Sequence, residues 1–269
     1  IKAEKQKEEE LELKDAEYKL NLLKIDLETI LEDIKNKASS IKDFYEAERE
    51  KPYDANLLFR TPSNKYTRIL DLDRLSIYKG FKIFLSDQEK WLKSFNRLYN
   101  TLDYLPLFFD EIYSIYDNHS NTKFNKKSEI TDMLLNFNNL GSQFLTTYKI
   151  ETNAKNYLDH PASSIVNNAM DVYYQILRGN YDEEGNFQSE SDFDEFSNEM
   201  LLPFISEALN QRRNSVTFDR RLEPLMQLAS NIRKKIHLIK QESIWFSKNV
   251  ENQYKSCLLY TSPSPRDGL

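Results

Sequence analysis

The chain has 269 residues and a formal net charge of −6, with 30% charged and 39% hydrophobic residues. Only five residues are glycine, and because β-rich proteins need turn glycines, a content far below the usual value of about 7% predicts a soluble helical protein. A single cysteine, Cys257, excludes a disulfide framework and cysteine metal sites, and the lack of a run of about 18 apolar residues predicts no membrane span.

Residues 1–50 carry the pattern of one long helix. Apolar residues recur at alternating steps of three and four, and nine of ten seam positions are apolar. The seam consists of Leu13, Ala16, Leu20, Leu23, Leu27, Ile30, Ile34, Lys37, Ile41 and Phe44. This pattern is typical of coiled coils and of long bundle helices. Lys37 is the exception, and we expect its ammonium group to reach out of the seam to water.

Residues 51–210 are predicted to form a central helical domain of shorter helices. Residues 86–89 match a capping box, which predicts a helix start. Pro106 should end one helix and Pro203 should kink or divide another, because proline lacks the N–H that a helix interior needs. The polar residues 119–125 are predicted to form a loop.

Residues 211–256 repeat the heptad pattern in a basic helix. Its seam is Phe218, Leu222, Leu225, Ala229, Ile232, Ile236, Ile239, Ser243, Phe246 and Val250. Because burial of each apolar stripe requires a partner and the two seams are equally long, we predict that the arms pair antiparallel, with Leu13 near Val250 and Phe44 near Phe218. Pairing between two copies of the chain is the open alternative. The expected fold is therefore all-α, a multi-helix bundle with two long terminal helices forming an antiparallel stalk around a smaller helical domain.

Residues 257–269 are expected not to be native protein. Cys-Leu-Leu-Tyr-Thr-Ser-Pro-Ser-Pro-Arg-Asp, beginning at Cys257, resembles one reading frame through the adapter used in transposon-based sequencing libraries. Ile1 is not an initiator Met. We therefore expect the gene to be cut at both ends, and we exclude this tail from reasoning about the fold.

Charge is distributed unevenly along the chain. Residues 211–256 hold ten basic and four acidic residues, whereas residues 181–199 hold eight acidic residues and no basic one. A basic stripe can bind phosphate groups. The acidic segment can equally shield this stripe, and most charges on helix faces are simply solvated. The candidate polyanion contacts are Arg212, Arg213, Arg220, Arg221, Arg233, Lys234 and Lys235.

No residue is predicted to be catalytic or to bind a cofactor or a metal, because the spacings of helical metal sites and of phosphate-binding glycine loops are missing. Arg233 and His237 resemble the Arg-x(4–6)-His motif of HEPN-type ribonucleases. Only three residues separate them, so we assign no catalysis. The series Trp91, Phe95 and Tyr99 lies among basic residues and could stack on bases, but its spacing of four favours a core stripe.

These observations predict a non-enzymatic helical interaction or scaffold protein of microbial, bacterial type, located in the cytoplasm. Its partner would be another protein or a second copy, bound through the heptad helices. The alternative is a helical nucleic-acid-associated or phage-defence-type factor, including an RNase, that uses the basic C-terminal arm. A signal or membrane anchor upstream of this sequence stays open.

Overall fold

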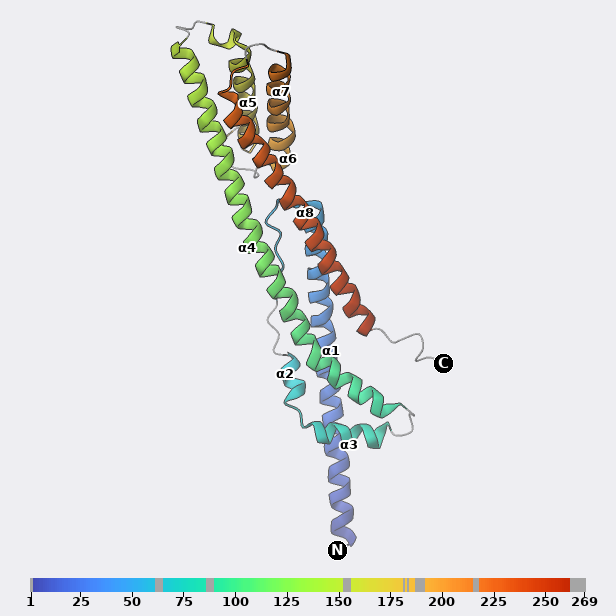
Figure 1. Cartoon of the computed structure of the whole chain (residues 1–269). Coiled ribbons are helices and arrows are strands. Elements are labelled where there is room, and N and C mark those ends of the chain that lie inside the picture. Colours follow the sequence, from blue (N-terminus) through green and yellow to red (C-terminus); the bar gives the residue numbers. More distant parts are fainter. Residues whose placement is uncertain are drawn as a thin grey trace. The chain divides into compact units, whose positions relative to one another are not determined.

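The computed structural model describes residues 2–60, 65–85, 90–151, 156–180, 182, 184–186, 192–214 and 218–261. These residues form helices joined by turns, without any strand among them, which confirms the all-α multi-helix bundle (Figure 1). The helices are α1 (Lys2–Glu50), α2 (Lys65–Leu70), α3 (Arg74–Phe84), α4 (Trp91–Glu151), η1 (Tyr157–Asp159), α5 (Pro161–Arg178), α6 (Phe193–Glu195), the π-helix η2 (Phe196–Leu201), α7 (Leu202–Asn214) and α8 (Leu222–Thr261).

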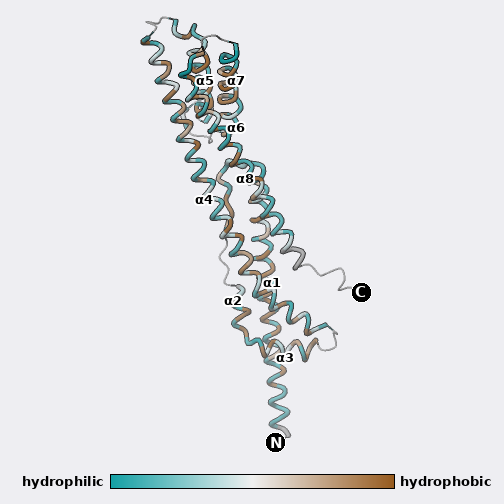
Figure 2. Tube along the Cα trace, viewed as in Figure 1, coloured by the Kyte–Doolittle hydropathy of each residue, from teal (hydrophilic) through white to brown (hydrophobic). Residues whose placement is uncertain are grey.

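The chain divides into two compact units. Unit 1 comprises residues 1–47, 56–118 and 247–269, and unit 2 comprises residues 48–55 and 119–246. The predicted central domain, residues 51–210, contributes to both. Along the helices, hydrophilic and hydrophobic residues alternate, whereas the first turns of α1 are hydrophilic (Figure 2).

In unit 1, α1 buries most of its predicted seam from Ala16 onward. Leu20, Leu27 and Ile34 are half-buried, and Leu13 is exposed. α3 packs closely against α1 at Gly80, where an added Cβ would lie 2.9 Å from Leu20 Cγ. Asp73 caps α3 by accepting hydrogen bonds from the backbone N–H groups of Leu75 and Ser76.

Lys37 does not reach water as predicted. It is 5% exposed, its Nζ lies 3.1 Å from Asp33 Oδ2, and it faces the rings of Tyr66 and Phe109 at 5.3 and 5.1 Å. A carboxylate one turn earlier and two aromatic faces stabilise the ammonium inside the unit.

The predicted register of the two long arms is wrong. Ser247 Oγ donates a hydrogen bond to the backbone oxygen of Tyr45 at 2.7 Å, and the rings of Tyr45 and Tyr254 lie 6.0 Å apart. The end of α1 therefore contacts the end of α8, although the prediction placed Phe44 near Phe218. Most positions of each seam are buried, but an apolar stripe specifies the face of a helix and not the partner that covers it.

The predicted helix end at Pro106 and the predicted loop at 119–125 are also wrong, because α4 runs unbroken through both and turns near its start (Figure 1). An internal proline removes one hydrogen bond and bends a helix without always ending it. Residues 119–125 stay helical because Lys123 Nζ donates to both carboxylate oxygens of Glu48, at 2.9 and 3.0 Å, and the His119 ring stacks on Phe246 at 3.8 Å.

Unit 2 has a continuous apolar core formed by α4, α5, η2, α7 and α8. α8 contributes its predicted seam, with Leu222, Ala229 and Ile232 fully buried. Pro161 stands at the first turn of α5, where its missing N–H costs no helical hydrogen bond, and His160 caps that helix through its Nδ1. The predicted capping box at 86–89 lies outside the described residues, as do residues 262–269 of the tail.

Candidate functional site

The seven predicted polyanion contacts lie in different surroundings. Arg212 lies 3.9 Å from Glu223, and Lys235 lies 2.8 Å from Glu129. Arg213 and Arg220 are exposed and have no ion pair among the described residues. These basic residues therefore do not form one continuous charged track.

Arg221 belongs to a structural cluster at the start of α8. Its guanidinium pairs with Asp219 at 2.9 Å and with Glu151 at 2.8 Å, and it covers the ring of Tyr148 at 4.4 Å. Burial raises the pKa of Asp219, but hydrogen bonds from Arg221 and from the Tyr148 hydroxyl outweigh it and lower this pKa to about 2. Burial, together with the bond to Asp219, raises the pKa of Tyr148 to about 12.

Arg233 and Lys234 are brought together in a groove of about 570 Å³ in unit 2, which we call the α8 groove. Its residues are Asp194, Ser197, Asn198, Ile205, Ser230, Arg233, Lys234, Ile236, His237 and Lys240. One wall is α8, where the spacing of Arg233, His237 and Lys240 places them on one helix face.

The opposite wall comes from a π-helical segment, η2, which contains Ser197 and Asn198. The backbone N–H of Leu202 bonds to the oxygen of Ser197, a five-residue spacing that ends directly before Pro203. Proline cannot donate the next helical hydrogen bond, and the widened turn provides the irregularity that Pro203 was predicted to cause. Single π-helical turns are frequent at functional sites.

Charge is divided between the two ends of the α8 groove. At one end, Asp194 accepts hydrogen bonds from Lys240 and, at 2.8 Å, from the hydroxyl of Tyr53. Burial, and then the bond to Asp194, raise the pKa of Tyr53. This end is therefore internally neutralised.

The other end of the α8 groove is positive. Arg233 Nε donates to Ser197 Oγ at 3.3 Å, and no carboxylate of the described residues forms an ion pair with Arg233 or Lys234. Lys234 and His237 are exposed, and their side chains form no hydrogen bond within the described part of the chain. In segment 181–199, Asp194 is the described acidic residue that pairs with α8, through Lys240. Within the described residues, the shielding predicted from the sequence therefore reaches Lys240 and not Arg233 or Lys234.

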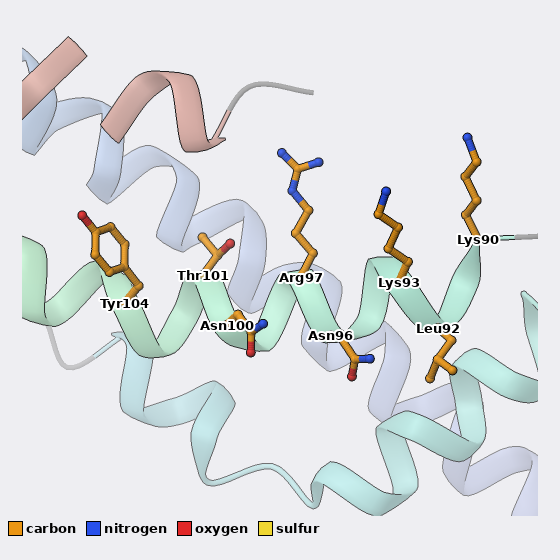
Figure 3. A pocket seen from close by; sticks show the side chains of 8 residues that line it. All are labelled: Lys90, Leu92, Lys93, Asn96, Arg97, Asn100, Thr101 and Tyr104. Carbon is orange, nitrogen blue, oxygen red and sulfur yellow. The ribbon is translucent and has the colours of Figure 1, made fainter. Parts of the chain in front are cut away.

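A second pocket, of about 990 Å³, lies along the start of α4 in unit 1. Figure 3 shows Lys90, Lys93 and Arg97 leaving the helix on one side. Each of these cations already has an interaction partner. Phe95 and Tyr99 are buried, which confirms that they form a core stripe.

Sequence reasoning missed Ser197, Asn198 and Lys240. Lys240 could have been found from its helical spacing to Arg233, whereas nothing in the sequence indicates that η2 faces α8. Among the described residues, no group of three His, Cys, Asp or Glu side chains is placed to hold a metal ion. In the same part of the chain, every helix is too short or too polar to span a membrane.

Comparison with known protein families, with curated proteins and with solved structures gives no match to this chain.

Proposed function

We propose that the protein is a non-enzymatic helical interaction protein that binds an acidic segment of a partner protein through the α8 groove. The observation that supports this most directly is the positive end of the groove, where Arg233, Lys234 and His237 lie without a paired carboxylate of the described residues. A charged cleft of this kind attracts and orients an anionic partner.

The groove favours binding over catalysis. Ser197 Oγ accepts its hydrogen bond from Arg233, and His237 does not contact it by a hydrogen bond. A serine nucleophile requires a base that takes its proton, and no described residue is hydrogen-bonded to Ser197 as such a base. The resemblance of Arg233 and His237 to a ribonuclease motif thus gains no support from their surroundings.

An acidic protein segment fits better than a polynucleotide. Arg221 and Lys235 are held by carboxylates of the same chain. Between Arg233 and Lys240 the groove follows α8 for only about 10 Å, at the helical rise of about 1.5 Å per residue. Nucleic-acid binding depends on several phosphate contacts spread along a strand. Binding of a nucleic acid is therefore the alternative outcome of the binding experiment.

The test measures fluorescence anisotropy of a labelled Glu-rich peptide and of a single-stranded RNA, each titrated with the whole protein at about 50 and about 200 mM salt. We expect the peptide to bind, and Lys234→Glu to weaken it about tenfold, since a hydrogen bond to a charged group contributes about 1.5–3 kcal/mol. Lys248→Glu is the matched control, an exposed lysine on the same helix outside the groove. RNA binding that ignores Lys234→Glu, without peptide binding, would overturn the proposal.

A further inference from the structure

We infer that the positive end of the α8 groove is a binding site for a phosphate monoester, carried by a phosphorylated side chain of the partner or by a small molecule. This inference rests on the proposed function, because it specifies the anion that the same groove accepts. Three features of the groove support it.

The first feature is the orientation of Arg233. Its Nε donates to Ser197 Oγ at 3.3 Å, which fixes the plane of the guanidinium, while no described residue pairs with its two terminal nitrogens. Guanidinium groups bind phosphate through two parallel N–H···O bonds, and an oriented group makes them at a smaller entropic cost than a free one. An exposed, unoriented arginine such as Arg220 lacks this arrangement.

The second feature is the hydroxyl of Ser197. Ser197 is 7% exposed, and its oxygen accepts from Arg233 without donating to any described residue. A serine hydroxyl has one hydrogen to donate, and here a ligand oxygen beside Arg233 would receive it. The amide of Asn198, next in η2, lies on the same groove and offers two further donors.

The third feature is the amount of charge. A phosphate monoester carries about −1.5 to −2 charges at neutral pH and three acceptor oxygens. Arg233 and Lys234 together balance such a dianion, whereas a single carboxylate would leave one cation uncompensated. Asp194 does not compete for these residues, because it is held by Lys240 and Tyr53 at the other end of the groove.

The test compares N-acetyl-phosphoserine amide with N-acetyl-glutamic acid amide, which differ in the anion and contain no partner sequence. Each is titrated into the whole protein labelled with nitrogen-15, and the signals of Arg233 Nε–H and of the Ser197 backbone are followed. We expect saturation by the phosphoserine compound at a concentration about tenfold lower than by the glutamate compound, as bidentate, doubly charged contacts require. Arg233→Lys keeps the charge but loses the planar fork, and it should abolish most of this preference, while Lys248→Gln should preserve it.

Equal binding of the two compounds would overturn the inference. The Glu-rich peptide assay tests the proposed function separately. A groove that binds acidic segments without preferring phosphate would bind the Glu-rich peptide, whereas a groove without any ligand would not. A phosphoserine placed inside the Glu-rich peptide distinguishes the sources. If this phosphopeptide binds more tightly than N-acetyl-phosphoserine amide, the ligand is a phosphorylated partner. If inorganic phosphate binds as tightly as the phosphopeptide, the ligand is a small-molecule phosphate. Both results support the phosphate site.

Discussion

Replacing Glu48 by Met should strongly destabilise unit 2. Glu48 is 1% exposed and accepts hydrogen bonds from Lys123 at 2.9 and 3.0 Å, and its Oε1 lies 2.8 Å from His119 Nε2. Its loss leaves the ammonium of Lys123 in a site where the side chain is 8% exposed. Breaking a buried ion pair from one side costs about 3–5 kcal/mol, a large part of a typical stability of about 5–15 kcal/mol.

The double variant Glu48→Met with Lys123→Met provides the decisive comparison. Apolar side chains of similar volume commonly replace a buried ion pair at little cost, so the double variant should recover to within about 1 kcal/mol of the parent. Urea unfolding followed by far-UV circular dichroism measures all three free energies. If the single variant loses less than about 1 kcal/mol, or the double variant is as unstable as the single one, the ion pair does not have the role given to it here.

The pH dependence of the single variant follows from the same pair. Burial lowers the pKa of Lys123, while Glu48 opposes this shift. Removing Glu48 lowers the folded-state pKa further below the unfolded value of about 10.4. The unfolded chain then binds more protons between these two values, so the stability deficit relative to the parent should be large at neutral pH and should shrink as the pH rises towards about 10.

Three further predictions concern other parts of the chain. Since the pKa of Asp219 is lowered to about 2 in the folded protein, its carboxylate stabilises the fold above the unfolded pKa of about 4, and this stabilisation is lost between about pH 4 and 2. Asp219→Asn should therefore lower the free energy of unfolding by about 1–2 kcal/mol at neutral pH, and its stability should fall less steeply in acid unfolding curves. Deleting residues 257–269 should leave the Tm unchanged in a thermal melt, whereas a loss of several degrees would show that the tail packs as native protein. Asp194→Asn removes the carboxylate that the described residues contribute to the α8 groove. It should raise the affinity for N-acetyl-phosphoserine amide about twofold to fivefold in the same titration, more at low than at high salt; unchanged affinity would place the anion away from this groove.

The periodicity of apolar residues predicted which helix faces are buried, but it did not predict which helices pack against those faces. The seam of α8 lies in the core of unit 2 up to Ile239, whereas its last part meets Tyr45 in unit 1. A heptad stripe contains no information about whether its neighbour is a long arm or several shorter helices. Equal seam length was therefore a weak reason for pairing, and the domain ranges derived from it stay a prediction.

Polar composition gave wrong predictions at positions where polar side chains are buried against one another. Residues 119–125 have the composition of a loop, yet Lys123 and Glu48, from distant parts of the sequence, satisfy each other inside unit 2. Lys37 is a similar case, since Asp33 and two aromatic rings replace the water that it was expected to reach. Such pairs are visible only after the fold has brought their members together.

Contacts made by the fold also decide which basic residues can bind an anion. Arg221 and Arg233 are both candidate contacts by their charge in the sequence, but Arg221 pairs with two carboxylates and Arg233 donates to a serine hydroxyl. With a net charge of −6, the chain as a whole repels a polyanion, and at a Debye length of about 8 Å this repulsion fades within one or two helix turns. Selection of an anion must then come from contacts inside the α8 groove rather than from the long-range field.

A single phosphate bound in the α8 groove should lose affinity with rising salt far less steeply than a nucleic-acid strand that displaces many counterions. The slope of affinity against salt therefore reports whether the ligand occupies one groove or extends along a surface.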